Sequence, residues 1–148
     1  MSSTGTSEAV EIRPIPQDRL AALWPALLPF AEKLAARFPD DWPVAELRRQ
    51  AAAGELVLWL AYDRAALTPL ALMGTDLFTH PSGRRSLRVR MTAGEGHARW
   101  VRAAERVAVA HARANGCARI EIDEARDGWS RALPDYRRVR RSTLTKEL

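Results

Sequence analysis

The stretch Met91-Thr92-Ala93-Gly94-Glu95-Gly96 (MTAGEG) decides the fold, because it joins two segments with different hydrophobic periods. Residues 86–91 alternate apolar side chains with arginines, which is the period of a β-strand. Residues 97–115 repeat their apolar side chains every three or four positions, which is the period of an amphipathic helix. A helix start has unpaired N–H groups and a partial positive charge. The sequence therefore predicts a strand–turn–helix junction at which glycines would let phosphate groups approach the backbone.

Similar patterns on both sides of this junction predict the remaining strands and helices. Strands are expected at 9–15, 56–62, 69–78, 86–91, 119–123 and 139–148, and helices at 20–38, 44–53, 97–115 and 129–133. Pro25 and Pro29 lie inside the first helix, and each removes a backbone donor, so a kink or two helical pieces are expected there. The order β-α-α-β-β-β-α-β-α-β predicts one α/β domain with a mixed, mostly antiparallel sheet and helices on both faces.

Length and composition place the chain among soluble globular proteins. Its 148 residues fit one domain, expected at 9–148 after a polar tail at 1–8. No stretch approaches 18 uninterrupted apolar residues, so no membrane span is expected. The tail has neither a basic start nor an apolar run, so it does not have the pattern of a secretory signal, and a cytoplasmic location is expected.

The single cysteine and the distribution of charges limit the kinds of binding site that the sequence predicts. Cys117 is the single cysteine, so it is expected to be a small buried residue, and no Cys/His cluster has the spacing of metal ligands. The net charge of +5 is a feature that many nucleic-acid-binding proteins share. The densest basic run, Arg137-Arg138 with Arg140-Arg141, would split between two faces of a strand, so duplex binding is not expected. A phosphate-bearing ligand or an acidic protein partner fits the charge equally well.

The order of elements and the glycine junction together resemble the GNAT acetyltransferase superfamily. In that family the junction reads Gln/Arg-x-x-Gly-x-Gly/Ala, and its backbone binds the pyrophosphate of coenzyme A. The resemblance implies acetyl-CoA as the cofactor and a single GNAT-like domain. It places the cofactor-binding positions at Met91, Thr92, Ala93, Gly94, Glu95, Gly96 and His97.

This junction also departs from the family pattern. Met91 replaces the leading Gln/Arg, and Arg90 comes one residue early, on the opposite side of an alternating strand. Glu95 adds a negative charge where phosphates would lie. Two interpretations stay open: a working coenzyme pocket, or a degenerate one in which Gly94 and Gly96 only make a tight turn.

Candidates for proton transfer are few. Many members of the family use a Tyr after the fifth strand as general acid, within Phe-Tyr-x-x-x-Gly-Phe. The alignment puts Leu133 at that position, and Tyr136 follows three residues late, where a packing role is the alternative. Asp76 and Glu121 lie on predicted strands and are candidates for the general base, although strand carboxylates are usually only solvated. Trp129, at a loop–helix junction, could line a cleft or a partner surface.

A narrower resemblance covers most of the chain from about residue 10. Residues 115–122 (NGCARIEI), 126–136 (RDGWSRALPDY) and the closing Lys146-Glu147-Leu148 resemble GNAT-like proteins of tailed phages and gene transfer agents. That resemblance implies a structural or interaction role in a virion or its assembly, with other virion or assembly proteins as partners or a homo-oligomer. The alternative is an active acetyl-CoA-dependent N-acetyltransferase.

Overall fold

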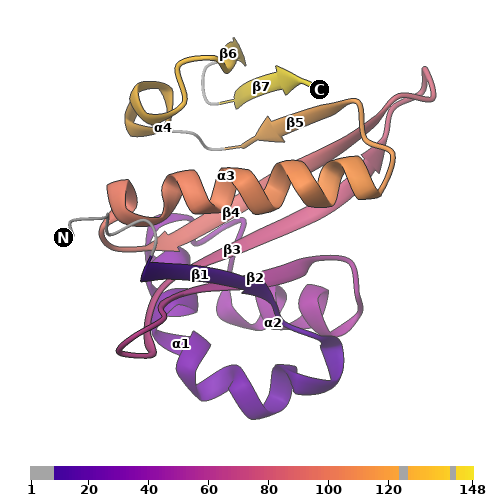
Figure 1. The fold of residues 1–148 in the computed structure, drawn as a ribbon. Helices are drawn as coiled ribbons and strands as arrows, with labels where there is room; N and C mark the ends of the chain where they lie inside the picture. Colours follow the sequence, from indigo (N-terminus) through magenta and orange to yellow (C-terminus); the bar gives the residue numbers. More distant parts are fainter. Residues whose placement is uncertain (1–8, 124–126, 141–142) are drawn as a thin grey trace, which may run out of the picture.

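The computed structural model describes residues 9–123, 127–140 and 143–148 and is built on one seven-stranded sheet in the order β1-β2-β3-β4-β5-β7-β6 (Figure 1). The strands are β1 (Val10–Pro14), β2 (Val57–Asp63), β3 (Thr68–Thr79), β4 (Arg85–Gly94), β5 (Arg119–Ile122), β6 (Arg137–Arg140) and β7 (Thr143–Glu147). The helices are the 3-10 turn η2 (Gln17–Arg19), α1 (Leu20–Arg37), α2 (Val44–Ala52), α3 (His97–Ala114) and α4 (Asp127–Ala132). The mixed, mostly antiparallel sheet is as predicted. The predicted tail at 1–8 lies outside the described residues.

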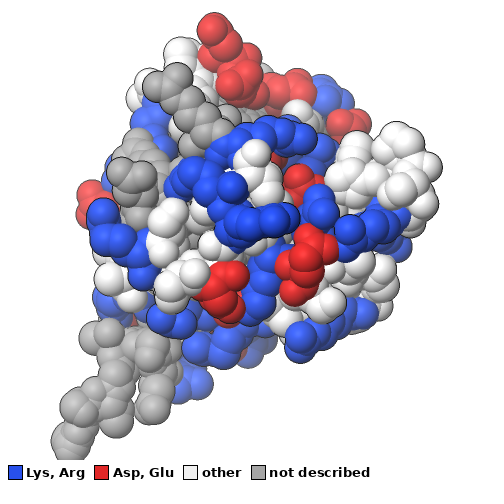
Figure 2. All heavy atoms as spheres, turned by 90° about the horizontal axis from the view of Figure 1, so that it is seen from above, with Lys and Arg blue, Asp and Glu red and all other residues white. Residues whose placement is uncertain are grey.

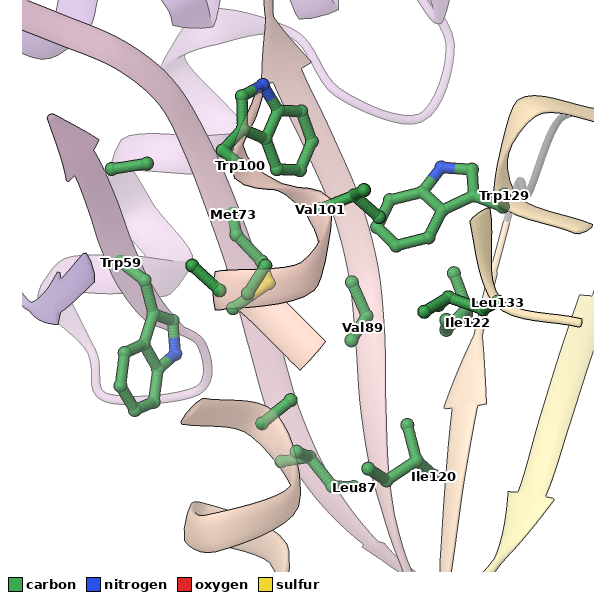
Figure 3. Close-up of a cluster of buried hydrophobic side chains, with 14 of the residues drawn as sticks. Trp59, Met73, Leu87, Val89, Trp100, Val101, Ile120, Ile122, Trp129 and Leu133 are labelled. Carbon is green, nitrogen blue, oxygen red and sulfur yellow. The ribbon is translucent and has the colours of Figure 1, made fainter. Parts of the chain in front are cut away.

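Helices cover both faces of the sheet, and each face has its own buried cluster. On one face, α3 packs Val101 and Ala104 against strand residues such as Ile120 (Figure 3). On the other, α1 and α2 pack Leu27 and other apolar residues against strand residues that include Leu72. The two clusters fix the sheet between two helical layers, because burial of apolar surface is the main favourable contribution to folding.

Helix α1 runs unbroken through Pro25 and Pro29, so the expected division into two pieces is not seen. Both prolines are exposed, whereas Trp24, Leu27 and Ala31 are buried against the sheet. Backbone groups on the exposed side can be solvated by water, and packing of the apolar stripe offsets the missing helical hydrogen bonds.

The C-terminal region forms a hairpin where the sequence predicts one strand at 139–148. Strand β6 pairs antiparallel with β7, with Arg138 opposite Leu144. All four residues of β6 are exposed, whereas Leu144 and its neighbours on β7 are buried. Residues 139–148 include no Gly, Pro, Asn or Asp, so the strongest turn signals are missing at the reversal. Figure 2 shows many Lys and Arg side chains on the face seen from above, the side of β6. Arg141, the last of the predicted basic run, lies outside the described residues.

Strands β4 and β5 diverge after a short parallel ladder, and this divergence positions the site. The ladder pairs Ser86–Val89 with Arg119–Ile122. Strand β4 then continues to Gly94, whereas β5 ends at Ile122. The last part of β4 therefore has β3 on one edge and, among the described residues, no strand on the other.

Two expected absences concern only the described ranges. None of the helices there combines the length and the apolar character that a bilayer-spanning segment needs. No group of three or more His, Cys, Asp or Glu side chains within those ranges is arranged to hold a metal ion.

Candidate functional site

A pocket of about 540 Å³ lies where β4 and β5 diverge, and we call it the cleft. Its walls come from β4 (Val89 and 91–94), the end of β5 (Ile122 and Asp123), the end of α1 (Arg37 and Phe38), α3 (His97 and Trp100) and α4 (Trp129 and Arg131). Figure 3 shows Trp100 and Trp129 at one end of the apolar cluster, with Val89 and Ile122 on the two strands. The cleft thus combines apolar walls with exposed strand backbone, as small-molecule sites commonly do.

A bulge at Arg90 changes which side chains of β4 point to each face. Val89 belongs to the cluster under α3 and Met91 to the cluster under α1, although residues two apart in a regular strand share a face. The pairing with β3 skips Arg90, because Thr75 lies opposite Val89 and Gly74 opposite Met91. Arg90 lies over the ring of Trp42, which belongs to the same α1 cluster as Met91. The expectation that Arg90 and Met91 point to opposite sides is therefore wrong, because one extra residue shifts the alternation.

The bulge also turns backbone groups toward the cleft. The Val89 oxygen accepts a hydrogen bond from Asp123 N–H on the β5 side, at 2.9 Å. Six residues later the Glu95 N–H donates to the Leu70 oxygen on the β3 side, at 3.3 Å. Counting back from Glu95, strand alternation places the N–H groups of Thr92 and Gly94 on the cleft edge.

The predicted phosphate loop is shorter than the sequence suggests. Met91, Thr92, Ala93 and Gly94 belong to β4, and only Glu95 and Gly96 form the turn before α3. Met91 is buried in the α1 cluster, so its side chain cannot take the place of a polar Gln or Arg. Glu95 is exposed, and its Oε1 lies 3.2 Å from Lys33 Nζ, which partly offsets its negative charge.

The local backbone geometry favours glycine at both position 94 and position 96. A Cβ on Gly94 would lie 2.4 Å from the Leu70 oxygen, so β3 passes too close for any side chain. Gly96 has φ of +64°, a left-handed conformation that most residues avoid, and the nearest atom to a Cβ there would be 3.8 Å away. Close packing against β3 therefore accounts for Gly94, the turn accounts for Gly96, and Gly96 still leaves open space at the helix start.

The N-terminus of α3 supplies unpaired donors. Arg99 N–H donates to the Gly96 oxygen at 2.7 Å. Within the described residues, the N–H groups of Gly96, His97 and Ala98 donate to no protein acceptor, and no side chain caps the helix. Such donors, together with the helix dipole, favour an anion at this position.

His97 lines the cleft and contacts two indoles. Its ring centroid lies 4.9 Å from that of Trp100 and 4.8 Å from that of Trp129. Its Nε2 is buried and has no hydrogen-bond partner within the described residues. Burial lowers the pKa of His97, because a charged imidazolium loses hydration there.

The three candidates for proton transfer lie outside the cleft lining. Asp76 accepts hydrogen bonds from both Arg88 and Arg90, at 2.8–3.0 Å. Glu121 is 6% exposed, and its Oε2 lies 3.2 Å from the Nε2 of His80.

Tyr136, the third candidate, is a buried residue of the α3 cluster. Its hydroxyl donates to Glu105 at 3.2 Å, and burial raises its pKa. Leu133, at the position of the family's acid, is 1% exposed. Neither residue is placed to protonate a group in the cleft.

Asp123 is a site residue that the sequence did not single out. It follows β5, lines the cleft, and keeps 26% of its side chain exposed. Burial raises its pKa, and Arg90 Nε, at 3.2 Å, lowers it to a smaller extent. A carboxylate directly after a buried strand could have been recognised, because active-site residues often follow strand ends.

Comparisons with known proteins bear on the fold. No protein-family model matches the chain, and no curated protein matches it by sequence. Similar solved structures include an acetyltransferase of Trypanosoma brucei (12% identity, TM-score 0.61, 89% of this chain and 95% of that one). A chain of the NatC complex bound to Gag peptide and CoA shares 15% identity (TM-score 0.68, 94% and 98%). A GNAT-family acetyltransferase of Listeria monocytogenes shares 10% identity (TM-score 0.61, 94% and 95%). The chain therefore has the fold of GNAT acetyltransferases.

Proposed function

We propose that this protein binds an acyl-coenzyme A in the cleft and transfers its acyl group to an amine. One observation carries the proposal: the cleft opens where β4 and β5 diverge, beside the unpaired N–H groups that begin α3. A structure of a predicted acetyltransferase of Clostridium acetobutylicum with acetyl-CoA has the same fold, at 15% identity and a TM-score of 0.58 over 84% of this chain and 86% of that one.

The residues present fit such a ligand mainly through the backbone. The N–H groups of Gly96, His97 and Ala98 would hold the pyrophosphate, and those of Thr92 and Gly94 would meet the amide groups of the pantetheine arm. Trp100 and other apolar residues of the cleft would exclude water from the reacting group. When bound, the coenzyme supplies an acyl thioester, which is activated toward amines.

Calorimetry with acetyl-CoA tests this proposal, and one substitution locates the phosphates. Ala98 is exposed in the first turn of α3, so Ala98→Glu places a carboxylate beside the free N–H groups. We expect about 10-fold weaker binding of acetyl-CoA, which corresponds to ~1.4 kcal/mol. Folding should be preserved, because a negative charge stabilises a helix start.

The matched control is Ala110→Glu, which makes the same charge change at an exposed position near the other end of α3. It should leave acetyl-CoA affinity unchanged. No detectable binding at millimolar acetyl-CoA, or equal affinities of the two variants, would overturn the proposal.

A second candidate function is a non-catalytic role in a virion or its assembly, in a protein of phage or gene-transfer-agent type. Two observations favour this role. The Tyr136 hydroxyl donates a hydrogen bond to Glu105, and Leu133 is buried, so neither Tyr136 nor Leu133 supplies a general acid to the cleft. Its partners would be other virion or assembly proteins or further copies of the chain, and its location would be the virion rather than the cytoplasm. Turnover of any amine with acetyl-CoA, measured as released thiol, would contradict this candidate.

A further inference from the structure

We infer that a second pocket, which shares Asp123 with the cleft, binds the acceptor and selects a small cationic amine. The inference rests on the proposed acyl transfer. The second pocket measures about 350 Å³ and is lined by Asp41, Trp42, Gln50, Arg90, Asp123 and Thr143. Because Asp123 also lines the cleft, a group bound in the second pocket lies beside a carboxylate that faces both cavities.

The charges of the second pocket favour a cation. Among the described residues, its lining carries the carboxylates of Asp41 and Asp123 and the guanidinium of Arg90. That guanidinium already pairs with Asp76 at 3.0 Å and with Asp123 at 3.2 Å. Asp41 is exposed and forms no ion pair within the described ranges. On a chain with a net charge of +5, the described lining of this pocket carries more negative than positive charge.

Trp42 adds an aromatic surface to the same pocket. It is buried in the α1 cluster, and the Arg90 guanidinium carbon lies 5.7 Å from its ring centroid. An aromatic face attracts cations, and it packs well against the alkyl part of an aliphatic amine. Gln50 and Thr143 add polar groups, so the lining suits a short polar amine better than a long apolar one.

The position of Asp123 gives it a role in the transfer. An ammonium group must lose a proton before its nitrogen can attack, and a carboxylate of raised pKa is suited to accept it. The nitrogen then bonds to the thioester carbonyl carbon, the C–S bond breaks, and a second proton from nitrogen ends on the departing sulfur. Asp123 afterwards releases its proton to water.

Asp76 acts in this scheme as a positioning residue. It holds Arg88 and Arg90 through three hydrogen bonds and thereby fixes the guanidinium that contacts Asp123. Its loss should change the pH dependence of turnover, because Arg90 would then pair with Asp123 differently. Rescue by Asp76→Glu would distinguish this role from a general loss of structure.

The test measures amine binding by calorimetry on the full chain with CoA present. The probes are 1,4-diaminobutane and 4-aminobutyrate, which have the same chain length but differ in one terminal charge. We expect 1,4-diaminobutane to bind at least 10-fold more tightly. Asp41→Asn should weaken its binding about 3-fold to 10-fold, whereas the neighbouring Asp40→Asn, which removes the same charge outside the pocket, should not.

A second variant tests the proton transfer. Asp123→Asn should keep amine binding within about 10-fold and lower the turnover number by ~10²-fold or more. Equal binding of the two probes, equal effects of Asp40→Asn and Asp41→Asn, or full turnover by Asp123→Asn would each overturn the inference. Acetyl-CoA binding that responds to Ala98→Glu alone would leave the proposed function standing while the amine pocket fails. If the chain binds the amine but not acetyl-CoA, the amine pocket would stand while the proposed function fails.

Discussion

Replacing Gly94 with alanine tests whether this glycine serves the fold or a ligand. Its Cβ would lie 2.4 Å from the Leu70 oxygen and 2.6 Å from the Cα and Cβ of Ala71. These contacts are with backbone and Cβ atoms of β3, directly paired with Gly94, so no flexible side chain can move aside. Overpacking costs ~1–3 kcal/mol, and a backbone conformation unsuited to alanine adds about 1 kcal/mol. We therefore expect about 3 kcal/mol of lost stability.

Thermal unfolding of the variants measures this loss. For a domain of this size, ~1 kcal/mol lowers Tm by about 2–4 °C, so Gly94→Ala should unfold roughly 10 °C below the natural chain. Gly96→Ala is the matched control, because its Cβ meets nothing closer than 3.8 Å. Only the left-handed backbone cost of ~1–2 kcal/mol applies there, which predicts a decrease of about 4 °C. A Tm of Gly94→Ala within about 1 °C of the natural chain would refute the steric argument.

Three further predictions concern ionisable side chains. Asp76→Asn should cost about 2 kcal/mol in urea unfolding, because two partly buried arginines lose their carboxylate. Glu46→Gln, which removes a more exposed carboxylate from a helical ion pair, should cost less than about 0.5 kcal/mol. Equal losses would contradict the claim that burial of the Asp76 ion pairs makes them stabilising. Tyr136→Phe should cost about 1 kcal/mol through the lost bond to Glu105 and leave amine turnover unchanged, and a large loss of turnover would restore this tyrosine as the acid. Burial lowers the pKa of His97 in the folded chain. As the pH falls, the unfolded chain therefore binds a proton at this histidine at a higher pH than the folded chain does. The free energy of unfolding should be constant above about pH 6.5 and decrease below it. Unfolding midpoints at pH 7.5 and 5.5 should differ less in His97→Gln, and an equal difference would show that another group is responsible.

The sequence correctly predicted those helices and strands whose buried side chains follow one regular period. The apolar run at 56–62 is β2, and the 3.6-residue period at 97–115 is α3. The single cysteine, Cys117, is buried as expected, and its thiol pKa is raised by that burial. Trp129 lines the cleft, one of the two positions expected for it.

The features that shape the site depend on pairing between distant strands. The bulge at Arg90 arises from the pairing with β3, and no local residue such as Gly marks it. The reversal between β6 and β7 likewise lacks a turn signal. Asp123 gains its place because β5 ends where the cleft opens, which depends on how far β4 extends beyond it. Such features are set by tertiary context, which overrides local propensity.

The short ladder between β4 and β5 also has a mechanical consequence. Within the part of the chain that the structure describes, four residue pairs, from Ser86↔Arg119 to Val89↔Ile122, join strands β1–β4 to the β5-β7-β6 part of the sheet. This seam is less than half as long as the nine-pair β3–β4 ladder, and the β5–β7 ladder beyond it is equally short. The outer strands should therefore open as one cooperative unit, with amide hydrogens of β5 and β7 exchanging together and before those of β3. The seam that creates the cleft would then also set how easily its two walls separate.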